Sequence, residues 1–352
     1  MNNINKKNDN NFNLLRLIFA ILVIFSHSFE LLDGNRKNEI LTKIFHTISF
    51  GDLSVDGFFL LSGYLIVKSW NTNPNIWQFL KKRILRIYPG FIAASLICAF
   101  IVGPLGSESD QYYLHFETGS FLKNMALLNR PFIPSVFSGQ PYAEVNGSMW
   151  SIFPEFRCYL AVMVLGAMGL IQKKNSWLIF TIIFYLLLII QKLCYKFDYS
   201  IFFFSYKFLY LNLTTFFFTG GCFYLYRNKI KFDKITASIA FIVLLIGMFS
   251  KFGADLVLGI AGGYLLFYFA LMPTRVLVKF NKIPDLSYGV YLYGWPVQKL
   301  LLWFFPIMSP YILFFISVIG CLILGVLSWY AIEKPFIKLK KEFWNFKLFL
   351  SN

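Results

Sequence analysis

Ten apolar segments follow one another along this chain, and they restrict the folds that it can adopt. They are residues 12–32, 50–68, 88–106, 148–171, 176–195, 201–226, 235–250, 255–273, 286–305 and 310–332. A helix of about twenty apolar residues crosses the hydrocarbon core of a bilayer. Only 14% of the residues are charged, whereas a soluble domain carries about 25%. We therefore predict an all-α integral membrane protein with about ten transmembrane helices, its membrane domain spanning residues 12–335.

Lysine and arginine gather in the connections that follow every even-numbered segment, and acidic residues gather after the third. The positive-inside rule then places both termini in the cytoplasm, as a polar tail at 1–11 and a basic tail at 336–352. This distribution also accounts for the net charge of +16, so we expect membrane lipids rather than nucleic acid as partners. The longest connection, 107–147, is predicted to lie outside and to shape an external substrate site.

Five cysteines lie within or at the ends of the apolar segments, without the spacing of a zinc site. They are Cys98, Cys158, Cys194, Cys222 and Cys321. We expect reduced packing residues, with no disulfide and no metal.

Ionisable residues inside apolar segments are costly and usually functional. Arg16 and His27 are eleven residues apart in the first segment, so they share a helix face about 16 Å apart along the axis. His27, Asp56 and Glu155 each lie roughly 8–10 Å below the predicted outer boundary. We predict a general-base site in which Asp56 or Glu155 orients His27, and the sequence leaves open which one. The alternative is three unrelated structural polar groups at one depth.

Basic residues mark the opposite, cytoplasmic side of the predicted bundle. Lys82, Arg83 and Arg86 share a helix face by their spacing, and Arg16 lies at the same end of its own segment. Arginine is suited to phosphate recognition, although lipid headgroups would also explain this charge. A ligand with phosphates inside and a reactive group near His27 must be long, and an acyl-coenzyme A fits both ends.

Six motifs along nearly the whole chain resemble the acyltransferase-3 family of multispanning membrane acyltransferases, which includes O-antigen and other surface-glycan O-acetylases. They are Arg16 with His27 (Arg-x10-His), 51–66 (second-helix signature), Arg83 to Pro89 (Arg-x-x-Arg-x-x-Pro), Trp150-Ser151 to Glu155, Leu286 to Pro296 (ninth-helix motif) and Glu333-Lys334-Pro335. The resemblance implies transfer of an acyl group, by default acetyl, from acetyl-CoA to a hydroxyl of a surface glycan or lipid-linked saccharide. It also implies a bacterial inner-membrane location and partnership with glycan-assembly proteins.

The resemblance implies that His27 is the leading catalytic residue and that Arg83 and Arg86 bind the donor. From their depth, Asp56 and Glu155 join His27 as catalytic candidates, and Arg16 joins the donor-binding residues from its place at the cytoplasmic end. Trp150, Ser151, Tyr291 and Tyr293 are the expected substrate contacts. Gly294 stands where many members carry a histidine, so no role can rest on a second histidine there. His46 and His115 match no motif, and we expect them to be exposed.

Two other classes of function compete with this interpretation. Buried carboxylates and a histidine also suit a proton-coupled transporter or flippase for a sugar or anionic substrate, although the chain has no detectable inverted repeat. The Gly294 departure also keeps open a catalytically inactive scaffold in a glycan-assembly complex. Acyl-CoA cleavage that depends on an acceptor sugar would distinguish the enzyme from both.

Overall fold

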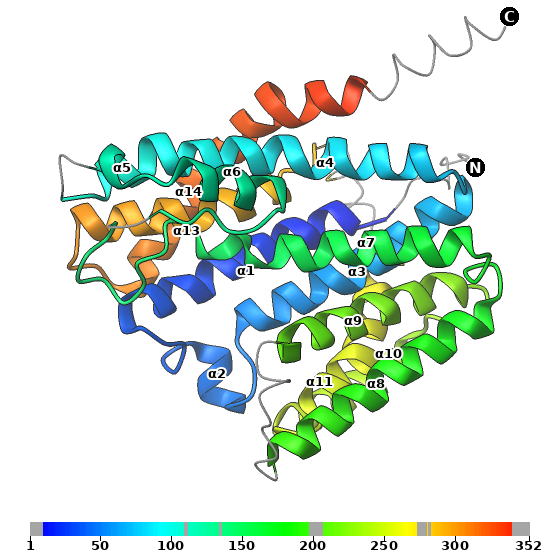
Figure 1. The fold of residues 1–352 in the computed structure, drawn as a ribbon. Helices are drawn as coiled ribbons and strands as arrows, with labels where there is room; N and C mark the ends of the chain where they lie inside the picture. Colours follow the sequence, from blue (N-terminus) through cyan, green and yellow to red (C-terminus); the bar gives the residue numbers. More distant parts are fainter. Residues whose placement is uncertain are drawn as a thin grey trace, which may run out of the picture. The chain divides into compact units, whose positions relative to one another are not determined.

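The computed structural model describes residues 10–108, 112–133, 136–196, 207–272, 280 and 283–339, and every regular element in this part of the chain is helical (Figure 1). The prediction of an all-α protein is therefore confirmed for the described residues. The chain forms two compact units. Unit 1 contains Met1–Arg16, Ile40–Phe79 and Pro154–Ile283, and unit 2 contains Leu17–Glu39, Leu80–Phe153 and Pro284–Asn352.

The main helices follow the predicted apolar segments. They are α1 (Phe12–Asp33), α3 (Phe50–Thr72), α4 (Ile76–Ile97), α7 (Ile152–Ala167), α8 (Lys174–Lys196), α9 (Lys207–Leu225), α10 (Lys234–Met248), α12 (Gly263–Leu271), α13 (Ser287–Phe304) and α14 (Pro310–Ser328). Shorter α-helices are α2 (Ile40–Phe45), α5 (Gly103–Leu105), α6 (Thr118–Ala126) and α11 (Ala254–Val257). The described elements also include two 3₁₀ helices, η2 (Tyr112–His115) and η3 (Gly147–Ser151), and three π-helical turns, η1 (Cys98–Val102), η4 (Leu258–Gly262) and η6 (Trp329–Glu333).

Six helical stretches among the described residues are long and apolar enough to cross a membrane. They are Phe12–Asp33, Phe50–Thr72, Ile76–Leu105, Lys174–Cys194, Ala254–Leu271 and Pro310–Leu339. A helical membrane protein follows from these stretches, while the number of ten spans and the orientation of the termini stay predictions. The predicted tails and the start of the sixth segment lie largely outside the described residues, although Asn11 is buried and donates a backbone hydrogen bond of 2.8 Å to Ala270.

One predicted boundary was wrong. The basic stretch and the third apolar segment form one helix, α4, which begins at Ile76 and continues through Pro89. The side chain of Asn75 accepts the backbone N–H of Gln78 and fixes this earlier start, and membrane helices tolerate an internal proline. The fourth segment, predicted from residue 148, begins with the 3₁₀ helix η3 at Gly147 and becomes the α-helix α7 at Ile152.

Within unit 1, α9 packs closely against both α3 and α8. A Cβ atom added at Gly63 would lie 1.9 Å from the Phe217 carbonyl oxygen, and one added at Gly220 would lie 2.0 Å from the Leu60 carbonyl oxygen. The backbones of α3 and α9 therefore touch at two places where only glycine fits. Small residues at such contacts let membrane helices associate through van der Waals packing.

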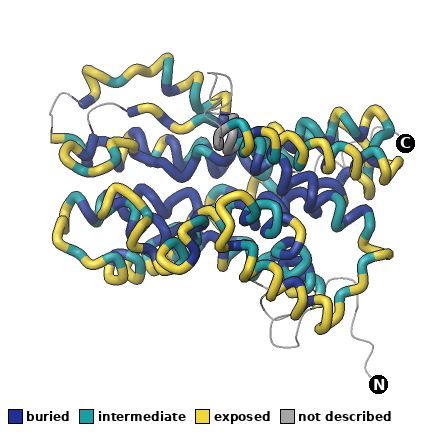
Figure 2. The backbone as a smooth tube through the Cα atoms, turned by 90° about the horizontal axis from the view of Figure 1, so that it is seen from below, coloured by how far each residue is buried: buried dark blue, intermediate teal, exposed yellow. Residues whose placement is uncertain are grey.

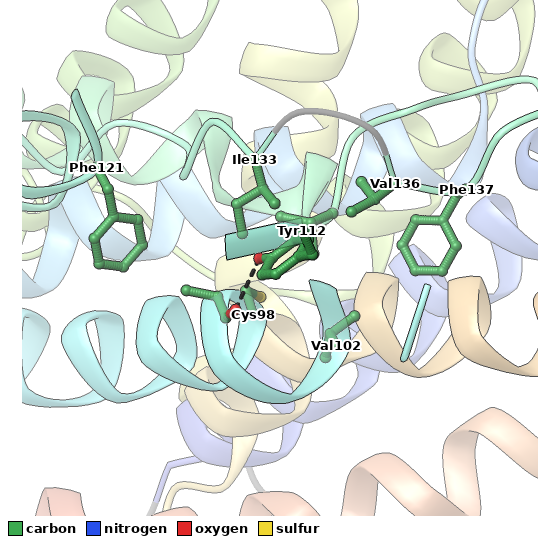
Figure 3. Packing of buried hydrophobic residues seen from close by; sticks show 9 residues of the cluster. Cys98, Val102, Tyr112, Phe121, Ile133, Val136 and Phe137 are labelled. Atoms are coloured by element: carbon green, nitrogen blue, oxygen red, sulfur yellow. Dashed lines mark hydrogen bonds between the residues drawn. The ribbon is translucent and has the colours of Figure 1, made fainter. Parts of the chain in front are cut away.

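Within unit 2, α13 packs against α14, and the described part of the long connection folds onto the end of α4. Figure 3 shows this cluster of buried side chains, in which the Tyr112 hydroxyl donates to the Ala99 carbonyl at 2.8 Å. The members are Cys98, Ala99, Val102, Tyr112, Phe121, Ile133, Val136, Phe137 and Val145. The connection is thus held by its own core before it reaches η3.

Large apolar side chains stay exposed in continuous rows along several helices. On α8 the row consists of Leu178, Ile179, Ile182, Ile183, Leu186, Leu187, Ile190 and Leu193. This spacing marks one face of a helix, and an exposed apolar stripe of this length is expected to face lipid rather than water. Figure 2 shows exposed stretches alternating with buried ones along the helices. All five cysteines are free thiols, and His46 and His115 are exposed as predicted.

Candidate functional site

His27 lies in α1 and has a carboxylate partner on the same helix. Its Nδ1 is 2.8 Å from Oε2 of Glu30, one helical turn later, and only 5% of His27 is exposed. The same Glu30 oxygen accepts from Nε of Arg36 at 3.0 Å and lies 2.9 Å from Nη2 of Arg36. Glu30 therefore connects a buried imidazole to a partly exposed guanidinium. A carboxylate on Nδ1 fixes the tautomer with the proton on Nδ1, so Nε2 carries the lone pair that can act as a base.

The other ring nitrogen of His27 faces a serine. Ser148 Oγ lies 3.4 Å from His27 Nε2, and Ser148 is 1% exposed. Residues next to Ser148 are fixed against α13. The Asn146 side chain donates to the Leu292 carbonyl at 2.9 Å, and a Cβ at Gly147 would lie 2.7 Å from the Trp295 ring. The approach of this backbone to α13 therefore sets where the Ser148 hydroxyl can lie.

Two of the predicted substrate contacts meet beside Ser148. The Tyr291 hydroxyl donates to the Ser148 carbonyl at 2.7 Å, so it can accept the Ser151 hydroxyl at 2.7 Å. Both side chains are buried, and their hydrogen bonds tie η3 to α13. The structure thus brings Ser151 and Tyr291 together next to Ser148, and their role as substrate contacts stays a prediction.

Aromatic side chains cover this group of residues. The Trp295 ring meets the His27 ring edge-on at 4.8 Å between centroids, and Trp295 Nε1 donates to the Glu144 carbonyl at 3.0 Å. Tyr142 packs on Trp295, and its hydroxyl donates to the Gly34 carbonyl at 3.0 Å. Burial and the nearby Glu30 carboxylate raise the pKa of Tyr142 above its ordinary value. These contacts exclude water from the imidazole, which strengthens its interaction with Glu30.

The backbone of the same connection is further anchored by a lysine from α13. Lys299 is buried, donates through Nζ to the Tyr142 carbonyl and lies 4.7 Å above the centre of the Phe137 ring. The part of the connection that packs near His27 is therefore held at two points, by hydrogen bonds from Trp295 and Lys299.

Asp56 and Glu155 belong to unit 1, whereas His27 belongs to unit 2. The buried Asp56 accepts from the Asn212 side chain at 3.4 Å. Oε1 of Glu155 accepts from the hydroxyls of Ser62 and of Tyr159, the latter at 2.6 Å. His27 contacts the carboxylate of Glu30, and the catalytic roles of Asp56 and Glu155 stay predictions.

Arg86 is surrounded by acids and aromatic rings of unit 2. Its Nη2 lies 2.7 Å from Oδ2 of Asp285, and its Nη1 lies 3.1 Å from Oε2 of Glu333, which is 1% exposed. The rings of Tyr288 and Trp329 lie 5.9 Å and 5.7 Å from the guanidinium carbon. Three of the six motifs therefore meet in one ion cluster that joins α4 to α13 and η6.

The remaining predicted residues are placed as follows. Arg16 is half-buried near the start of α1, in unit 1, and Arg83 is half-buried on α4, in unit 2. Trp150 is half-buried in η3, and Tyr293 is buried in α13. Among the described residues, no group of three or more histidine, cysteine, aspartate and glutamate side chains is arranged to hold a metal ion.

Glu30, Arg36 and Ser148 are the site residues that sequence reasoning missed. Glu30 was detectable, because residues three apart on a helix are neighbours. Ser148 lies 121 positions from His27 and comes before the Trp-Ser motif, so only the tertiary structure reveals it.

Comparison with known proteins gives one family over nearly the whole chain. The acyltransferase-3 model, described as an acyltransferase domain, matches residues 9–332. An "O-acetyl transferase" of Shigella phage Sf6 is 26% identical over 348 residues, which cover 93% of this chain and 96% of the relative. "Nodulation protein 10" of Rhizobium leguminosarum bv. viciae is 26% identical over 360 residues, which cover 94% of each chain.

A shorter match is to the "Acyltransferase MdmB" of Streptomyces mycarofaciens, which is 25% identical over 147 residues, covering 40% of this chain and 35% of the relative. No solved structure matches the chain.

Proposed function

Because the chain belongs to the acyltransferase-3 family, we propose that it transfers an acyl group from an acyl-CoA to a hydroxyl of a surface glycan or lipid-linked saccharide. Acetyl is the proposed group, since one full-length relative is named an O-acetyl transferase. The proposed location is a bacterial inner membrane, which suits the apolar helical stretches of the described residues.

The observation that carries the proposal is the contact of 2.8 Å between His27 Nδ1 and Glu30. In the proposed reaction His27 Nε2 removes the proton from the attacking hydroxyl, and Glu30 stabilises the imidazolium that forms. The attack on the thioester carbonyl breaks the carbon–sulfur bond, and the proton on His27 passes to the departing thiolate. The products are an ester and free coenzyme A.

Donor binding is assigned to the basic residues of α4. Arg83 supplies a guanidinium, which binds phosphate oxygens in pairs, and Lys82 supplies a second positive charge for the phosphates. Arg86 suits this role less well, because Asp285 and Glu333 already neutralise its charge. We propose that Arg86 stabilises the fold through its ion pairs with Asp285 and Glu333. The donor role of Arg16, which belongs to the other unit, stays a prediction.

The proposal is tested with the full-length protein in lipid nanodiscs. Release of the coenzyme A thiol from acetyl-CoA is measured with and without a mixture of cell-envelope saccharides. We expect acceptor-dependent thiol release with the wild type and none with His27→Ala, which should insert and purify normally. Equal release by the two proteins would remove His27 from the mechanism. No release from any acyl-CoA, together with acceptor movement across the membrane, would favour a transporter.

A further inference from the structure

Ser148, His27 and Glu30 form a chain of three groups. Ser148 Oγ is 3.4 Å from His27 Nε2, and His27 Nδ1 is 2.8 Å from Glu30 Oε2. A nucleophile next to a base that is oriented by a third group is the arrangement found in enzymes that form covalent intermediates. The longer distance is normal for such a pair without substrate, since these hydrogen bonds tighten when the reaction complex forms.

We propose that Ser148 is the nucleophile that first accepts the acyl group, so that the protein works through an acyl-serine intermediate. The proposal rests on the acyltransferase function proposed above and specifies its first step. His27 takes the proton of the Ser148 hydroxyl, and Oγ forms an ester with the acyl carbon as the carbon–sulfur bond breaks. The thiolate takes the proton from His27 and leaves as coenzyme A.

The second half of the cycle repeats the chemistry with the acceptor. His27 takes the proton of the saccharide hydroxyl, whose oxygen attacks the acyl carbon of the Ser148 ester. The bond between that carbon and Ser148 Oγ breaks, and His27 returns its proton to Oγ. Donor and acceptor therefore use the same base one after the other, and neither step needs a further reactant.

The position of Ser148 beside His27 favours an acyl-serine intermediate over direct transfer to the acceptor. A hydroxyl acceptor that reacts directly needs His27 Nε2 for itself, but Ser148 already faces that nitrogen. His27 and Ser148 are both at least 95% buried, so an acceptor that reacts directly would have to displace the Ser148 hydroxyl from His27.

The backbone around Ser148 is held firmly. Its carbonyl accepts from Tyr291 at 2.7 Å, the Asn146 side chain is bound to the Leu292 carbonyl, and Gly147 leaves no room beside Trp295. A nucleophile needs this kind of positioning, because misplacement by about 1 Å costs on the order of a hundredfold in rate.

Isotope exchange tests the intermediate without requiring it to accumulate. The full-length protein in nanodiscs is incubated with acetyl-CoA and labelled coenzyme A, with no saccharide present. An acyl-enzyme returns its acyl group to labelled coenzyme A, so label enters acetyl-CoA. We expect exchange with the wild type, none with His27→Ala, and a fall of about a thousandfold or more with Ser148→Ala. Ser317→Ala, which removes a fully buried serine of α14, is the matched control and should exchange normally.

A second variant covers the case in which Ser148→Ala does not fold. Ser148→Cys keeps a nucleophile at the same place, and we expect it to exchange at a reduced rate. Its acyl group should be a thioester on the peptide that contains residue 148, released by neutral hydroxylamine. The wild-type ester should resist that treatment and be released only at alkaline pH.

Three results would overturn the proposal. Exchange by Ser148→Ala at the wild-type rate would place the acyl group elsewhere, for example on His27. Acceptor-dependent transfer by the wild type without any exchange would show direct transfer and would leave the proposed function intact. Absence of both transfer and exchange with every acyl-CoA would instead refute the acyltransferase function on which the inference rests.

Discussion

Replacing Glu30 with glutamine removes one charge from the site and little else. The glutamine has the same length, and its carbonyl oxygen can still accept the Nδ1–H of His27, which lies 2.8 Å from the carboxylate. The ring should therefore keep its position. The variant loses the charged partner that stabilises the imidazolium formed during transfer, so Glu30 acts as a positioning residue with an electrostatic contribution.

The size of the effect follows from this single contact. A hydrogen bond to a charged group contributes about 1.5–3 kcal/mol and one between neutral groups about 0.5–1.5 kcal/mol, so loss of the charge alone costs about 1–1.5 kcal/mol. At about 1.36 kcal/mol for each factor of ten, the transfer rate should fall roughly 5- to 13-fold. Arg36 shares the same carboxylate oxygen, but 26% of its side chain is exposed, so water can solvate it in the variant. Arg36→Ala should accordingly slow the reaction only a few-fold.

Steady-state thiol release with saturating saccharide measures this effect. We expect kcat to fall in Glu30→Gln while the KM for acetyl-CoA and the thermal unfolding temperature stay near the wild-type values. Glu117→Gln is the matched control, because it removes an exposed carboxylate of unit 2 and should leave the rate unchanged. A Glu30→Gln protein with the wild-type kcat would show that the charge of Glu30 does not contribute to transfer.

Three further predictions concern packing and the ion cluster. Gly63→Ala should destabilise the protein by about 3 kcal/mol or more, because the added Cβ would meet the backbone of α9. Gly119→Ala has open space around its Cβ and should not destabilise the protein. Thermal unfolding in detergent compares the two variants. Arg86→Ala should remove the guanidinium from the buried carboxylate of Glu333 and cost about 3–5 kcal/mol. A stable variant with only a raised KM for acetyl-CoA would restore the donor-binding role. Gly294→His should overpack against α1 and destabilise the protein by about 1–3 kcal/mol, which lowers its unfolding temperature. A variant that is more active than the wild type would contradict this prediction.

Hydrophobicity decides where the helices lie, and so the sequence predicts them well. Helix α13 begins and ends within one residue of the predicted apolar segment. The start of α4 was missed because the third segment was defined by its apolar run, which begins only at residue 88, whereas the helix also includes the basic stretch before it. The basic residues that were predicted to share a helix face therefore lie on the same helix as the third apolar segment.

One contact of the site is local and others join distant parts of the chain. Depth in the predicted bundle favoured Asp56 or Glu155 beside His27, and their roles stay predictions. In the structure His27 contacts Glu30, one turn away on the same helix, so helix spacing alone could have identified this carboxylate. The partners of Arg86 are 199 and 247 residues away, so the charge compensation in that cluster could not be seen from local spacing.

We propose that this protein acylates a saccharide through His27. Mass spectrometry of surface glycans tests this proposal in cells that express the wild type, His27→Ala or neither, with equal protein levels in the membrane. We expect the glycans to gain the mass of an acyl group only with the wild type. An equal gain with His27→Ala, or no gain with wild-type protein present, would contradict it.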